Sequence, residues 1–175
     1  MKKAAGKDLL KDQTFDVVEF ELGGERYAMD IGFAREIVEM MPITPIPRAP
    51  HYLCGVMNLR GEITNILDIN SILGIPEEKI RESRKIIVLS QEASEGENMG
   101  IVVDDVQSVL QVRESQIEKL GDSVTGRDSS QIKGVIKIRE PAGPEKGEGT
   151  LETVDLVIWI DIKGIIRELT TGSRN

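Results

Sequence analysis

Three apolar blocks occur twice in this chain, in the same order, and this internal repeat limits the fold more than any other feature of the sequence. Each block has the length and the Ile, Val and Leu content of a short β-strand. The matching pairs are Ala28–Ile31 with Gly100–Val103, Gly55–Leu59 with Gly134–Ile138, and Ile63–Ile69 with Leu156–Ile162. Three blocks repeated in one order indicate an internal duplication, so we expect two halves of similar architecture.

The pattern between these blocks predicts a mainly β protein with short helical caps. In the first half we expect strands at Phe15–Leu22, Tyr27–Ile31, Arg35–Met40, Leu53–Leu59 and Ile63–Asp68, and a helical cap at Asn70–Leu73. In the second half we expect strands at Lys85–Ser90, Gly100–Val103, Val106–Val112, Ile132–Ile138 and Leu156–Asp161, and a helical turn from Lys163 to Leu169. Five short strands per half suit a small closed barrel, because closure removes exposed strand edges.

The alternation within Phe15–Leu22 predicts a half-buried strand, with Val18, Phe20 and Leu22 on its inner face. We expect one barrel at about 15–75 and the other at about 85–169, and the repeat leaves open whether the halves exchange strands. Residues 1–14 and 170–175 are expected to be flexible ends. The Gly-, Pro- and Glu-rich insertion Arg139–Val154 has no apolar face, so we interpret it as a mobile excursion.

Composition excludes several classes of function. The net charge is −8 and aromatic residues make up 3%, so the basic stripe and stacking platforms of a nucleic-acid binder are missing. The one cysteine, Cys54, has no internal disulfide partner, which favours a reducing compartment. The N-terminus lacks the apolar run of a signal peptide, and no segment approaches the ~20 apolar residues that cross a bilayer. We therefore expect a cytoplasmic protein without direct membrane insertion.

Two aspartates at matching places in the repeat are the strongest candidates for catalysis. Asp68 and Asp161 each follow an apolar strand, and two such carboxylates could share a proton in a duplicated β-barrel enzyme. The residues that follow, however, are Ile69-Asn70 and Ile162-Lys163, not the small Ser/Thr-Gly pair that presents carboxylates on a tight loop. We favour a role for each aspartate as the cap of the short helix after it, with the enzyme as the alternative.

The other titratable groups do not make up a site. His51 and Cys54 lie close together in sequence, but a metal centre needs three or four ligands and the chain has no other His or Cys. Asp104-Asp105 is interpreted as a pair of solvated turn carboxylates. We therefore predict no catalytic residue, no metal and no cofactor.

The turn at Asn58-Leu59-Arg60-Gly61 carries a residue that its geometry does not explain. A tight turn between two apolar strands needs a glycine such as Gly61, but it has no need of Arg60. Arginine is enriched at protein interfaces, where its planar fork pairs with carboxylates. Arg60 is thus a candidate partner contact at a barrel rim.

Several motifs together resemble the CheW-like domain of chemotaxis coupling proteins. These are Arg35-Glu36-Ile37-Val38, Ile46-Pro47-Arg48-Ala49-Pro50, Gly55-Val56-Met57-Asn58-Leu59-Arg60-Gly61-Glu62-Ile63, Leu67-Asp68, Gly100-Ile101-Val102-Val103-Asp104-Asp105-Val106 and Ile132-Lys133-Gly134-Val135. The resemblance covers about residues 15 to 169. It implies two packed SH3-like five-stranded β-barrels with a groove between them, and an adaptor without enzymatic activity in two-component signalling.

The resemblance also implies partners and contact residues. One barrel would bind the regulatory domain of the chemotaxis histidine kinase, and the groove would bind the cytoplasmic tip of a chemoreceptor coiled coil. Arg60 and Glu36 become candidate partner contacts, together with the motif residues Gly61, Asn58 and Arg48. The candidate apolar contacts are Ile37, Val38 and Val103.

Overall fold

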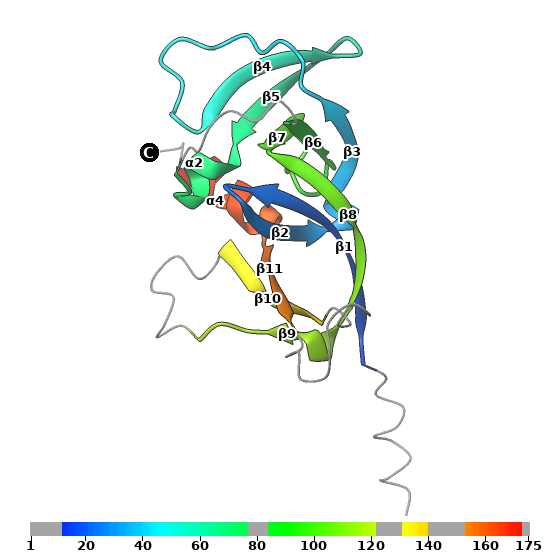
Figure 1. Cartoon of the computed structure of the whole chain (residues 1–175). Coiled ribbons are helices and arrows are strands. Elements are labelled where there is room, and N and C mark those ends of the chain that lie inside the picture. The colour runs from blue at the N-terminus through cyan, green and yellow to red at the C-terminus, as the bar shows by residue number, and fades with distance from the viewer. Residues whose placement is uncertain (1–11, 77–83, 122–130, 140–152, 173–175) are drawn as a thin grey trace, which may run out of the picture.

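The structure is a computed structural model that describes residues 12–76, 84–121, 131–139 and 153–172, and it contains two barrel-like sheets, one above the other in Figure 1. The six-stranded barrel consists, in spatial order, of β8 (Asp105–Arg113), β1 (Thr14–Leu22), β2 (Glu25–Asp30), β11 (Val154–Ile160), β10 (Ile132–Arg139) and β9 (Ile117–Glu118). The five-stranded barrel consists of β3 (Ala34–Glu39), β6 (Lys85–Leu89), β7 (Met99–Val103), β5 (Glu62–Asp68) and β4 (Leu53–Leu59). The prediction of a mainly β chain with two small barrels is confirmed.

The six-stranded barrel has one strand more than the repeat predicted. The additional strand is β9, which has two residues and pairs with Val135 and Ile136 of β10. The other five strands of this barrel follow the same order as those of its partner barrel. In one barrel the β1–β2 hairpin lies between β8 and the β10–β11 hairpin. In the other, the β6–β7 hairpin lies between β3 and the β4–β5 hairpin.

The two barrels do not correspond to the two halves of the sequence, because each half contributes a hairpin to the other barrel. The β1–β2 hairpin lies between β8 and β11, and the β6–β7 hairpin lies between β3 and β5. The joints β2–β11 and β5–β7 are parallel, whereas all other pairs are antiparallel. A boundary near residues 75–85 therefore does not separate the barrels in space.

Three apolar clusters hold this architecture together. One cluster fills the six-stranded barrel around Val17, Ile136 and Trp159, and another fills the five-stranded barrel around Met57 and Ile86. The largest cluster lies between the barrels and combines residues of both sheets with the C-terminal helix. Because this central cluster is continuous with both sheets, burial of apolar area fixes the barrels against each other.

Strand β1 is buried on both faces, so the expected half-buried strand is wrong. Val17 points into the six-stranded barrel and Val18 into the central cluster. Glu19, on the predicted outer face, is only 3% exposed, and its carboxylate is paired with Arg26 and accepts a hydrogen bond from Ser108 at 3.3 Å. A buried carboxylate requires such partners, since an unpaired one would be strongly destabilising.

Asp104 fastens the two barrels where the chain passes from β7 to β8. Its Oδ2 accepts a hydrogen bond from the Gly23 amide at 2.7 Å, and its own amide donates to the Glu21 carbonyl at 2.9 Å. Arg84 lies 3.7 Å from its other carboxylate oxygen. Asp104 is buried, which corrects the expectation of a solvated turn carboxylate.

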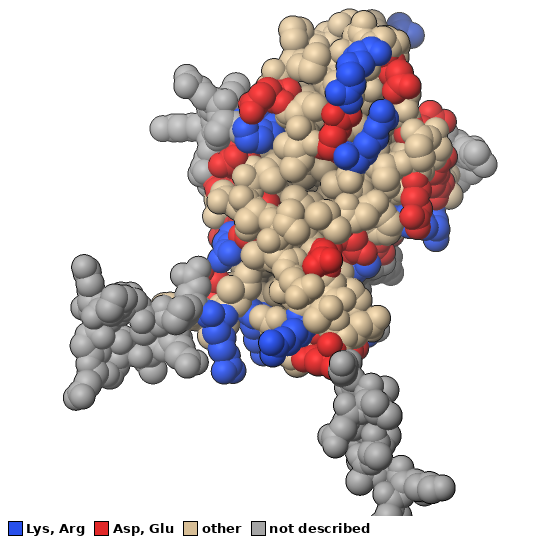
Figure 2. Space-filling view, turned by 90° about the vertical axis from the view of Figure 1, so that its right-hand side faces the viewer, with Lys and Arg blue, Asp and Glu red and all other residues tan. Residues whose placement is uncertain are grey.

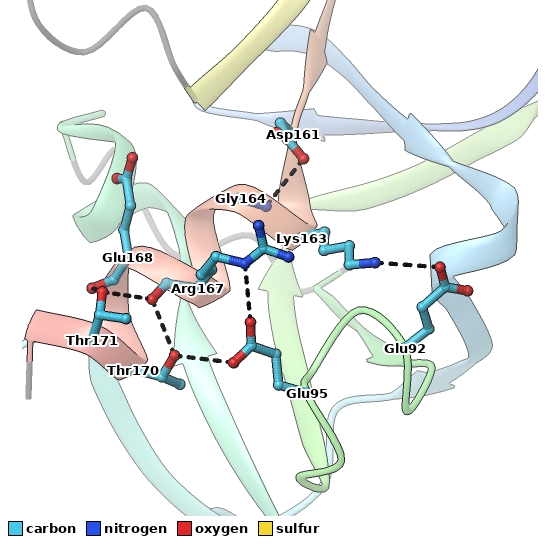
Figure 3. Close-up of polar contacts among 9 residues, drawn as sticks. All are labelled: Glu92, Glu95, Asp161, Lys163, Gly164, Arg167, Glu168, Thr170 and Thr171. Carbon is cyan, nitrogen blue, oxygen red and sulfur yellow. Dashed lines mark hydrogen bonds and ion pairs between the residues drawn. The ribbon is translucent and has the colours of Figure 1, made fainter.

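Two α-helices close the junction. The first, α2 (Ile69–Leu73), ends at Gly74, as predicted, whereas α4 (Ile162–Gly172) is longer than the predicted turn and extends through part of the expected flexible tail. Figure 3 shows how α4 is attached to the loop between β6 and β7: Lys163 pairs with Glu92 at 3.4 Å and Arg167 with Glu95 at 3.2 Å. These contacts hold α4 over the central cluster, to which it contributes Ile162, Ile165 and Ile166.

Two expectations from the sequence concern residues that the structure largely does not describe. The N-terminal segment 1–11 and the insertion at 140–152 lie outside the described residues. Thr14, placed in the flexible N-terminus by the sequence, is the first residue of β1 and pairs with Arg113.

Candidate functional site

The β4–β5 hairpin presents Arg60 on a turn that is strained for an arginine. Arg60 and Gly61 both have positive φ, 51° and 87°, as a two-residue hairpin turn requires. Asn58 stabilises the turn, because its Oδ1 accepts a hydrogen bond from the Gly61 amide at 2.8 Å. Asn or Gly would suit the position of Arg60 better. The local geometry of the turn therefore disfavours an arginine at position 60.

The Arg60 side chain closes the rim of the five-stranded barrel. Its guanidinium is hydrogen-bonded to Glu36 of β3, and so it connects the two edge strands of the sheet. Arg35 lies 3.8 Å from Glu62 and 4.0 Å from Glu36. We call Arg35, Glu36, Arg60 and Glu62 the rim cluster. The hydrogen bond to Glu36 and its negative charge raise the pKa of Arg60 above the ordinary value, so the arginine stays charged.

The predicted residues of β3 divide between two faces. Ile37 points outward and is 44% exposed, whereas Val38 packs against the cluster inside the five-stranded barrel. Glu36 is partly buried and reaches the rim. The structure therefore unites Arg60, Gly61 and Asn58 with Glu36 at one rim and leaves Ile37 on the adjoining surface.

Two predicted residues lie elsewhere. Val103 is 1% exposed in the central cluster, so its side chain supports the core and cannot contact a partner. Arg48 is exposed in the proline-rich loop with a φ of 60°, and among the described residues no ion pair to it is found. Neither residue joins the rim cluster.

A second surface, of which the sequence predicted only Ile37, is apolar and extends over both barrels. Ile31 is 40% exposed in the 3-10 helix η1 (Ile31–Phe33), which connects the barrels, and Val109 is 58% exposed on β8. Together with Ile37 they form what we call the junction face. Strands β3 and β8 follow the side of the molecule that Figure 2 shows, where a broad uncharged area lies below charges of both signs. The signal in the sequence was only an isolated apolar residue in each segment.

The paired aspartates act as helix caps. Asp68 Oδ1 accepts a hydrogen bond from the Ser71 amide at 3.3 Å, and Asp161 Oδ1 accepts one from the Gly164 amide at 3.0 Å (Figure 3). Each bond satisfies an amide of the first helical turn that would otherwise lack a partner. The two aspartates at matching places in the repeat therefore have the same structural role: Asp68 caps α2 and Asp161 caps α4.

Replacement of the cap of α4 tests this interpretation. Asp161→Ala is expected to lower the free energy of unfolding by about 1 kcal/mol, the usual effect of losing an N-cap. Asp161→Asn should be nearly neutral, because Asn caps equally well. Thermal and urea unfolding of both variants measure the difference. Equal destabilisation by Asn and Ala would show that the charge, and not the cap, matters.

Within the described part of the chain, no group of three His, Cys, Asp or Glu side chains is arranged to hold a metal ion. Over the same residues, no helix has the length and apolar character needed to cross a bilayer. The His51 ring instead packs edge-on against Tyr52, with 5.8 Å between ring centroids.

The two barrels exchange hairpins and carry a charged rim and an apolar face. This is the architecture of a protein that binds other proteins. The comparisons assign the family. Residues 16–170 match the CheW-like domain, and the chain therefore belongs to the CheW-like family. It is 31% identical to the chemotaxis protein CheW of Thermotoga maritima over 163 residues, which cover 93% of each chain. It is 30% identical to that of Bacillus subtilis over 69% of this chain and 76% of the relative.

A solved structure of similar fold supports the same assignment. It is the scaffolding protein CheW of Thermoanaerobacter tengcongensis, with a TM-score of 0.68, 28% identity and coverage of 85% of both chains. The chain is thus a non-catalytic adaptor of chemotaxis signalling. The alternative of a carboxylate enzyme has no support from the family, and the capping bonds of Asp68 and Asp161 account for both residues.

Proposed function

We propose that this chain couples a chemoreceptor to the chemotaxis histidine kinase by binding each partner with a different surface. The cytoplasmic tip of the receptor coiled coil binds the junction face, and the regulatory domain of the kinase binds the rim cluster. The observation that carries this assignment is an exposed apolar surface and a charged one that adjoin on the same scaffold but share no residue. A cytoplasmic location is part of the proposal, because the receptor tip is cytoplasmic.

The chemistry of the junction face suits a coiled-coil tip. Exposed large apolar side chains that extend over two sheets indicate an interaction site more than scattered surface residues do. Ile31 comes from η1, which connects the barrels, Ile37 from β3, an edge strand of the five-stranded barrel, and Val109 from β8, an edge strand of the six-stranded barrel. A helical partner could place its apolar stripe along such a surface and so remove these side chains from water.

The rim cluster suits a more polar partner. Arginine with a neighbouring carboxylate offers both donors and acceptors in fixed positions, which gives specificity and orientation. Ile63, next to Glu62 on β5, is also exposed, so the rim combines charges with an apolar anchor. This combination of apolar centre and charged surroundings is common at interfaces between folded domains.

The proposed receptor-binding surface can be tested by a charge introduced on it. Ile31→Glu is expected to weaken binding of a receptor signalling-tip fragment by roughly tenfold or more, since a buried unpaired carboxylate is costly. Binding of the kinase regulatory domain should not change. Ile46→Glu is the matched control, because Ile46 is 41% exposed in the proline-rich loop and Ile31 is 40% exposed. Equal effects of both variants on receptor binding would contradict the assignment of the junction face.

A further inference from the structure

Asp30 occupies the capping position of η1 but does not cap it. An aspartate there usually accepts a hydrogen bond from an amide of the first turn, and no such side-chain bond is present. Instead, Asp30 Oδ1 accepts from the indole N–H of Trp159 on β11 at 2.7 Å. Its Oδ2 accepts from the ammonium of Lys133 on β10 at 3.0 Å. The carboxylate therefore joins the end of β2, where η1 begins, to β10 and β11 of the same barrel.

Lys133 stands between the barrel and η1. Its Nζ lies 5.0 Å from the centroid of the Trp159 ring and 6.0 Å from that of Phe33, the last residue of η1. Both distances suit attraction between a cation and an aromatic face. The same ammonium thus contacts a carboxylate and two rings, from both sides of the connection between β2 and β3.

The opposite side of η1 is attached to the five-stranded barrel. The Phe33 carbonyl accepts a hydrogen bond from the Ser90 amide, after β6, at 2.9 Å. η1 is therefore held by Lys133 and Trp159 through Asp30 on one side and by the backbone of Ser90 on the other. Ile31, directly after Asp30, has its place on the junction face set by these contacts.

We infer that Lys133 is a positioning residue for receptor binding, because it fixes Asp30 and η1 and so places Ile31 on the junction face. This inference rests on the proposed function. Lys133 would not need to touch the receptor, since its ammonium is already directed at Asp30 and the rings. Its contribution comes from a binding surface that is ordered before the partner arrives.

The full-length chain with Lys133→Met tests this inference, because methionine keeps an unbranched apolar stem and removes the charge. Receptor-tip binding should weaken roughly fivefold, a size typical of coupling through packed side chains. Lys133→Arg should restore most of the affinity, because a guanidinium also stacks on an indole and pairs with a carboxylate. Lys137→Met is the matched control, since Lys137 lies on the same strand and pairs with Glu118, away from η1. Kinase-domain binding should be equal for all variants.

Trp159 gives a second readout, because it is the one tryptophan of the chain. Its emission should change in Lys133→Met and in Asp30→Asn, and should stay as in the wild type in Lys137→Met. Unchanged emission in Lys133→Met would overturn the inference, and so would changed emission with unchanged receptor affinity. If Lys133→Met does not fold, Asp30→Asn carries the same test. Failure of Ile31→Glu to affect receptor binding would instead contradict the proposed junction face.

Discussion

Gly55→Ala is expected to lower the free energy of unfolding by about 3 kcal/mol, because overpacking and backbone strain act at the same position. Gly55 has a φ of 145°, which other residues rarely adopt. A Cβ there would overlap the Thr44 carbonyl oxygen and lie 2.8 Å from the carbonyl carbon. That oxygen accepts a hydrogen bond from the Val56 amide at 2.9 Å, so the alanine would push the proline-rich loop away from β4.

Thermal unfolding followed by circular dichroism measures this effect. A loss of 3 kcal/mol corresponds to a melting temperature lower by about 10 °C for a protein of this size. Gly24→Ala is the control, because Gly24 has a φ of 85° and no atom within 4 Å of the added Cβ. It should show the strain alone, about 1 kcal/mol. Equal losses for both variants would mean that the close approach of Thr44 does not matter.

Arg60→Glu should weaken binding of the kinase regulatory domain by roughly tenfold or more and leave the fold intact. The substitution removes the guanidinium donors of Arg60 and adds a third carboxylate to Glu36 and Glu62 in the rim cluster. The charge that the partner meets at this position is thereby reversed. Because the side chain is exposed, the melting temperature should change by no more than about 2 °C. Titration calorimetry with each partner, together with a melting curve, provides the measurement.

Two further variants separate the ion pair from the binding role of Arg60. Arg60→Asn suits the positive φ of the turn, so it should melt at the same or a higher temperature and still bind the kinase domain weakly. Arg60→Glu combined with Glu36→Arg restores a pair across the rim but should not restore binding. Full binding by Arg60→Asn would show that Arg60 is an ordinary surface residue. A collapsed melting curve would show that it is structural.

Local patterns predicted the features that depend on local chemistry. The turn at Arg60-Gly61 followed from a glycine between two apolar strands, and the caps at Asp68 and Asp161 followed from residue type and position. The exchange of hairpins between the barrels could not be predicted in this way. A β1–β2 hairpin has the same periodicity whether it pairs with β3 or with β8, because strand pairing depends on contacts far apart in sequence.

The candidate site shows the same limit. Arg60 was predicted because the turn does not require an arginine, but its contact with Glu36 joins residues 24 positions apart. Lys133 belonged to a family motif, but nothing in the sequence paired it with Asp30, 103 positions away. Glu19 was placed outside by alternation, since a two-residue period cannot show that both faces of a strand are covered, one by its own barrel and the other by the cluster between the barrels. Val103 was proposed as a contact from family resemblance, although its strand lies in the core.

Simultaneous binding of both partners is the central claim. Sedimentation velocity of the wild-type chain, mixed with a receptor signalling-tip fragment and the kinase regulatory domain, tests it most directly. Because the junction face and the rim cluster share no residue, we expect one species that contains all three proteins, and a mixture without this chain should not form it. Displacement of the kinase domain as the receptor fragment is added would contradict the account, since it would mean that the two partners compete for one surface.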